Sequence, residues 1–123
     1  MIRALWFLCI AATVWFALIP SAMGGIGGAG YHGVAFMVLG LLTPAAFPRL
    51  SLWLIWAALV AFGGGIELGQ ELMQFNRHGE WNDFATDAVA ATVGIVYYRV
   101  WLYLRGQMAR EGDAAEDDSD SPS

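Results

Sequence analysis

The sequence predicts an all-α integral membrane bundle of four transmembrane helices, followed by a disordered acidic C-terminal tail. Hydrophobic residues make up 58% of the 123-residue chain, and its mean hydropathy is +0.53. These values are too apolar for a soluble domain of this size. The apolar residues form four segments separated by short polar or Gly/Pro-rich stretches, and six of the eleven acidic residues lie in the last thirteen positions.

The four apolar segments have the length of membrane-spanning helices. They cover about residues 4–20, 31–48, 50–73 and 83–104. A helix that rises 1.5 Å per residue needs about 20 residues to cross a hydrocarbon core of about 30 Å. The sequence therefore predicts one transmembrane domain over residues 1–110.

The first segment also has the layout of a signal peptide, since it is apolar and follows Arg3. Residues 20–23 contain no clear small-x-small cleavage site, and more membrane sequence follows them. We therefore interpret the segment as an uncleaved helix. Five glycines in residues 24–30 predict a flexible connection after it.

The last residues of the chain, 111–123, are acidic and Ser-rich and include no large apolar residue. Such a segment cannot bury enough apolar surface to offset the conformational entropy lost on folding. The sequence therefore predicts that this tail is disordered.

The arginines predict the orientation in the membrane. If each of the four segments crosses the membrane, four arginines lie on one side of it, because even numbers of crossings separate them, and Arg77 lies on the other side. The four are Arg3, Arg49, Arg105 and Arg110. Because cytoplasmic loops carry the excess of positive charge, both termini are predicted to be cytoplasmic. The protein is then expected in the cytoplasmic membrane, with loops 20–31 and 73–83 facing outward.

Composition excludes some classes of function. The chain has no Lys and no run of basic residues interleaved with aromatics, so it does not predict a nucleic-acid surface. Its single cysteine, Cys9, cannot form an internal disulfide. The six Trp residues are typical of membrane-interface anchors and predict no cofactor site.

Polar residues cluster at one end of the predicted bundle. Four of them are spaced i, i+3, i+4, i+7 on the third segment, and Asp83 and Asp87 share a face of the fourth. Small residues after Asp87 admit a neighbouring helix, so we expect the two polar faces to meet near the outer membrane surface. The candidate binding residues are His32, Glu67, Gln70, Glu71, Gln74, Arg77, Asp83 and Asp87.

Alternative interpretations of this cluster exist. Any single member can face headgroups or water at the interface, whereas four polar residues on one face of an apolar helix favour a polar partner or cavity. Arg77 is expected to pair with Asp83 or Glu67. Histidine with carboxylates suits a cation, but the sequence has no HExxH, no Cys pair and no second histidine within the helices, and it therefore predicts no metal.

The order and spacing of these residues resemble the VanZ-like family of small bacterial integral membrane proteins, over about residues 31–97. The family pattern is Glu-Leu-x-Gln, a loop Arg, and Asp followed four residues later by Asn or Asp and then by Gly. The matching positions here are Tyr31-His32, Ile66-Glu67-Leu68-x-Gln70, Arg77, and Asp83-x-x-x-Asp87-x-x-Ala90-x-x-x-Gly94. Ala90 stands where the family has its first Gly.

The resemblance implies a role in the cell envelope, because the founding member of the family is linked to resistance to teicoplanin. It implies no particular biochemical activity. The first hypothesis is a polar outer pocket that binds a lipid or cell-wall precursor, with Arg77 contacting an anion. The second is a membrane enzyme that uses Glu67 and Asp83 as acid and base on such a lipid, and the third is a structural partner of another membrane protein.

Overall fold

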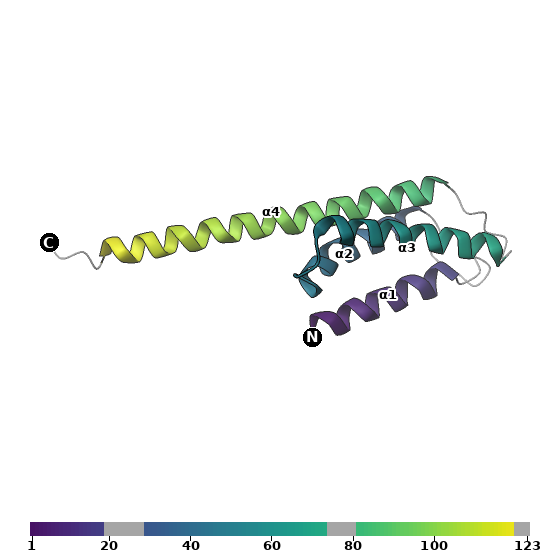
Figure 1. The fold of residues 1–123 in the computed structure, drawn as a ribbon, viewed down its shortest axis with the longest axis horizontal. Helices are drawn as coiled ribbons and strands as arrows, with labels where there is room; N and C mark the ends of the chain where they lie inside the picture. The colour runs from purple at the N-terminus through teal and green to yellow at the C-terminus, as the bar shows by residue number, and fades with distance from the viewer. Residues whose placement is uncertain (19–28, 74–80, 120–123) are drawn as a thin grey trace.

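The structure, a computed structural model, describes residues 1–18, 29–73 and 81–119 (Figure 1). Among these residues, Met1, the turn 47–51 and Met73 lie outside helices, and none forms a strand. Four helices follow one another in the described part of the chain. They are α1 (Ile2–Leu18), α2 (Ala29–Ala46), α3 (Leu52–Leu72) and α4 (Trp81–Ser119). The predicted all-α fold with four helices is confirmed.

The turn between α2 and α3 shows how local chemistry sets the helix ends. The amide of Leu50 donates to the carbonyl of Phe47 at 3.1 Å. Pro48 has no N–H to donate and disfavours helical backbone geometry at Phe47, and α2 ends just before it. Ser51 then caps α3, since its Oγ accepts a hydrogen bond from the Leu54 amide at 3.2 Å. Helices α2 and α4 each begin two residues before their predicted starts. The predicted end of the first helix, at Pro20, lies outside the described residues, as do most of the connections 20–31 and 73–83.

One helix in the described part of the chain, α3, is both long and apolar enough to cross a membrane. Helix α1 and the stretch 31–46 of α2 are apolar but shorter. The 17 residues of α1 extend over about 25 Å, less than the hydrocarbon thickness of about 30 Å. The described residues therefore contain the predicted number of helices, whereas four membrane crossings remain a prediction.

Helix α4 is longer than predicted and projects beyond the other three helices (Figure 1). It continues past the predicted end at Leu104 to Ser119, so residues 111–119 are helical where the sequence predicts disorder. Their side chains are exposed and bury nothing against the bundle. Nine of the fifteen residues 105–119 are Ala, Glu, Arg, Met or Gln, which favour helix, and the first proline after them is Pro122.

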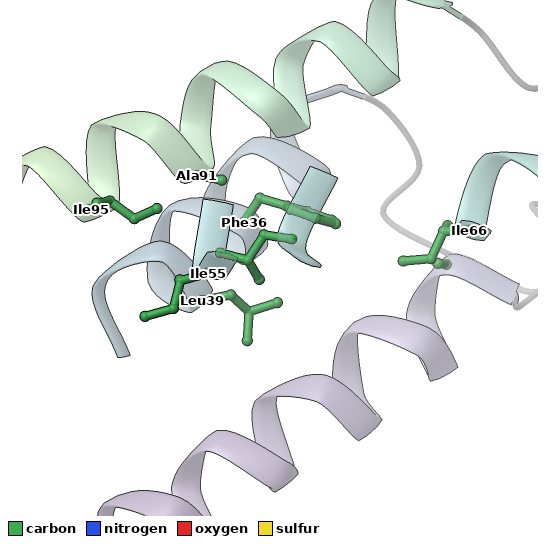
Figure 2. Packing of buried hydrophobic residues seen from close by; sticks show 8 residues of the cluster. Phe36, Leu39, Ile55, Ile66, Ala91 and Ile95 are labelled. Atoms are coloured by element: carbon green, nitrogen blue, oxygen red, sulfur yellow. The ribbon is translucent and has the colours of Figure 1, made fainter. Parts of the chain in front are cut away.

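The core of the bundle lies around α2, which contacts the other three helices and packs most extensively against α4. Figure 2 shows buried apolar side chains of the core: Phe36, Leu39, Ile55, Ala91 and Ile95 lie together, and Ile66 lies apart from them in this view. Helices α2 and α4 approach closely because small residues face each other: a Cβ built on Gly94 would lie 3.0 Å from the backbone carbon of Gly40. The predicted small-residue face of the last helix thus packs on α2, although α3 also contacts α4.

Contacts at the two ends show that α1 and α2 run in opposite directions. At one end, Arg3 Nε donates to the carbonyl oxygen of Ala46 at 3.2 Å and its guanidinium lies over the ring of Phe47. Toward the other end, the Tyr31 hydroxyl donates to the carbonyl oxygen of Ala12 at 3.4 Å. The start of α2 therefore lies beside the second half of α1, at the end of the bundle where the polar residues gather.

Candidate functional site

Three ionisable side chains from three different helices converge inside the bundle. They are His32 of α2, Glu67 of α3 and Asp87 of α4, and one nitrogen or oxygen atom of each lies within 4.8 Å of the others. We call this group the His–Glu–Asp cluster. His32 is 2% exposed and Asp87 is 1% exposed, while Glu67 is half-buried. The cluster is therefore a polar centre enclosed by an apolar bundle.

His32 and Asp87 contact each other directly. The distance from His32 Nδ1 to Asp87 Oδ2 is 3.4 Å. The second carboxylate oxygen of Asp87, Oδ1, is buried and has no hydrogen-bond partner among the described residues. Because burying an ionisable group without full compensation is costly, this arrangement points to a function beyond packing.

A glycine of α3 makes room for the Asp87 carboxylate. A Cβ built on Gly63 would lie 3.3 Å from Asp87 Oδ2 and 3.4 Å from Phe36 Cε1. Gly63 precedes Glu67 by four residues, so both lie on the same face of α3. The sequence prediction did not include Gly63, although this spacing is the signal that could have identified it.

Gln70 has a structural contact. Its Nε2 donates to the carbonyl oxygen of Ala17 at 2.7 Å, and the side chain is 6% exposed. Ala17 lies in the last turn of α1, where backbone carbonyls lack intrahelical partners. Gln70 therefore connects α3 to the end of α1 beside the His–Glu–Asp cluster.

The other predicted site residues have different positions. Glu71 is exposed, because it is rotated by about 100° around α3 from the buried Gln70. Asp83 is half-buried and lies one turn before Asp87 on α4. Gln74 and Arg77 lie outside the described residues. The predicted pairing of Arg77 with a carboxylate therefore remains a prediction.

The chemistry available to this arrangement follows from its donors and acceptors. An imidazole can give or take a proton, accept or donate a hydrogen bond, or bind a metal. Two carboxylates beside it accept hydrogen bonds and attract cations. The cluster can therefore bind a polar or charged group, or transfer a proton, in a setting shielded from water.

Comparisons with known proteins agree with the resemblance found in the sequence. A family model described as VanZ/LLP1 matches residues 6–102. This stretch includes all three residues of the His–Glu–Asp cluster. The comparison with curated proteins and the comparison with solved structures give no match.

Proposed function

The chain belongs to the VanZ/LLP1 family, and from this premise we propose that it is a multi-pass protein of the bacterial inner membrane with an outward-facing polar pocket. The pocket binds the headgroup of a membrane lipid or cell-wall precursor, and the His–Glu–Asp cluster forms part of its wall. In this role the protein contributes to the response of the cell envelope to glycopeptide antibiotics of the teicoplanin type.

A polar interior combined with an apolar exterior is the observation that supports this proposal. His32 and Asp87 are almost fully buried, whereas large apolar side chains are exposed on every helix: Trp15 is 67% exposed, Val34 59%, Trp53 74% and Val89 63%. In water, so much exposed apolar surface would cost about 25 cal/mol per Å². Lipid around the bundle removes that cost, and polar groups then remain only where a ligand or an interface needs them.

The arrangement of helix ends supports a pocket on the outer side. Arg3 and the turn that contains Arg49 lie at one end of the bundle, and the His–Glu–Asp cluster lies toward the other. If the arginine-bearing end is cytoplasmic, as the charge bias predicts, the cluster lies in the outer half of the membrane.

This topology predicts the result of labelling with a membrane-impermeant thiol reagent. In intact cells, and in a variant with Cys9→Ser, the reagent should modify Gly79→Cys and leave Gly112→Cys unmodified. Both variants should react equally once the membrane is permeabilised, which controls for accessibility. The reverse pattern in intact cells would contradict the proposed orientation.

An apolar pocket between α2 and α4 supports the proposal that the ligand has an apolar part. Its volume is about 350 Å³, and it is lined by Met37, Val38, Leu41, Val93, Gly94 and Tyr97. It begins about one to two helical turns from His32 and Asp87 along the two helices. Met37, Val38 and Leu41 lie about 120–180° around α2 from His32, so the pocket can accept an acyl chain on a different face of α2 from the His–Glu–Asp cluster.

Lipid binding to the purified protein tests the proposed function. Native mass spectrometry from detergent, with a polyprenyl phosphate and with phosphatidylglycerol as separate probes, should show one bound lipid. Glu67→Ala and Asp83→Ala should weaken binding at least tenfold with unchanged helix content, while Glu71→Ala, an exposed carboxylate on the same helix, should bind like the wild type.

The outcomes distinguish the three hypotheses. Equal lipid binding by the wild type and all three variants would contradict the polar pocket. Chemical conversion of the bound lipid would identify the enzyme instead of a simple binder. Absence of lipid binding, together with co-purification of a membrane protein that Glu67→Ala releases, would favour the structural subunit.

A further inference from the structure

We propose that the His–Glu–Asp cluster is a binding site for a divalent transition-metal ion, such as Zn²⁺ or Mn²⁺. The cluster brings together one imidazole and two carboxylates, from His32, Glu67 and Asp87. Zinc sites in proteins use histidine nitrogen and carboxylate oxygen as ligands, and carboxylates also suit manganese. The inference goes beyond headgroup binding, and it can be measured without any lipid.

The distances within the cluster fit a shared ion. Hydrogen bonds between charged N–H groups and carboxylates are commonly about 2.7–2.9 Å long, whereas His32 Nδ1 and Asp87 Oδ2 are 3.4 Å apart. Two ligand atoms bound to one tetrahedral ion at about 2.1 Å lie about 3.4 Å from each other. The three ligand atoms lie within 4.8 Å of one another. Rotation of the Glu67 side chain can shorten the separations that exceed about 3.4 Å.

Electrostatics also favours a cation at this position. The Asp87 carboxylate is 1% exposed, and its Oδ1 has no hydrogen-bond partner in the described part of the chain. A neutral imidazole with two carboxylates carries two negative charges, which a divalent ion neutralises. Glu67 can ligate through one carboxylate oxygen and keep another interaction through the second.

An ion held by three side chains keeps at least one open position, as in catalytic zinc sites. A water molecule or a phosphate oxygen can occupy that position. The ion would then supply the positive charge that an anionic headgroup requires beside Glu67, Asp83 and Asp87. This last consequence rests on the proposed function, whereas metal binding itself does not.

The sequence alone predicts no metal because it contains no local metal motif. Motifs such as HExxH place two ligands on one helix. Here the three ligands come from α2, α3 and α4, so only the packing of the three helices brings them together.

Metal titration of the full-length protein in detergent tests the proposal. After removal of bound metal with a chelator, Zn²⁺ and Mn²⁺ are added separately, and bound metal is measured by elemental analysis after desalting. We expect one ion per chain and a higher midpoint of thermal unfolding, since an ion that binds only the folded state stabilises it. Asp87→Asn and Glu67→Gln, which keep the shape of each side chain, should lower the affinity at least tenfold.

Matched controls separate this site from adventitious binding. The chain has two histidines, so His78→Ala should bind the ion like the wild type, as should Glu71→Gln. Absence of a bound ion in the wild type, unchanged affinity in Asp87→Asn, or loss of the ion in His78→Ala would each overturn the proposal. If a cluster variant fails to fold, retention of one ion per chain in His78→Ala still excludes His78 as a ligand.

Discussion

Gly94→Ala is expected to lower the free energy of unfolding by about 1–3 kcal/mol, the usual cost of overpacking. A Cβ at Gly94 would overlap the carbonyl oxygen of Met37 and would lie 2.9 Å from the amide nitrogen of Leu41. Both are backbone atoms of α2, so the overlap is relieved only by moving the helix. Thermal unfolding in detergent should show a lower midpoint, and the larger side chain of Gly94→Val should prevent stable folding.

Gly106→Ala is the matched control in the same helix. A Cβ at Gly106 has nothing within 4 Å, and replacing glycine by alanine inside a helix stabilises it by up to about 1 kcal/mol. The control should therefore unfold at the same or a higher temperature than the wild type. If Gly94→Ala behaves in the same way, then α2 and α4 do not pack as described.

His32→Ala is expected to destabilise the metal-free protein by about 3–5 kcal/mol, the cost of removing one partner of a buried ionisable pair. Asp87 is 1% exposed, and the substitution removes the contact that its Oδ2 makes with His32. Thermal unfolding in the presence of a chelator measures this effect separately from metal binding.

Adding Asp87→Leu to His32→Ala should recover a large part of that loss, because the buried carboxylate is then also removed. The two single variants and the double variant form a double-mutant cycle, and contacting residues should show strong coupling in it. Strictly additive effects would show that His32 and Asp87 do not interact in the folded protein. Glu71→Ala is a suitable control for α3, since its side chain is exposed.

The family match also divides α4 into two parts. It ends at residue 102, whereas α4 continues to Ser119. The cluster residues and the close contact with α2 all lie within the matched part, and the exposed acidic residues of the extension lie beyond it. The proposed pocket is thus built entirely from the part of the chain that the family shares.

Helix number and approximate helix position could be predicted from the sequence because the signals are local. A long apolar run favours a helix over its own length, and Pro48 and Ser51 affect only the helix ends beside them. The structure places the turn between α2 and α3 at these two residues. The end of α4 was harder to predict, because composition distinguishes an exposed helix from a disordered tail poorly. Residues 111–119 bury nothing, so no apolar pattern marks them as helical.

The predicted polar stripe on the third helix has a buried side and an exposed side, for a geometric reason. Successive residues of a helix point about 100° apart, so a stripe of four polar residues is wide enough to have an inward and an outward edge. The structure buries Gln70 against Ala17 and leaves Glu71 exposed. Which edge faces inward depends on the rotation of α3, which the packing of Ile55, Leu59 and Ile66 determines.

The sequence by itself determined the helical fold class, the membership in the family and the residue types available for a polar site. Only the tertiary structure decided that Asp87 meets His32, since the two residues are 55 positions apart and the close approach of α2 and α4 at Gly40 and Gly94 brings them together. Periodicity along one helix specifies a face of that helix. The helix that packs on this face is selected by the fit of side chains from both helices, and no single segment of the sequence contains that information.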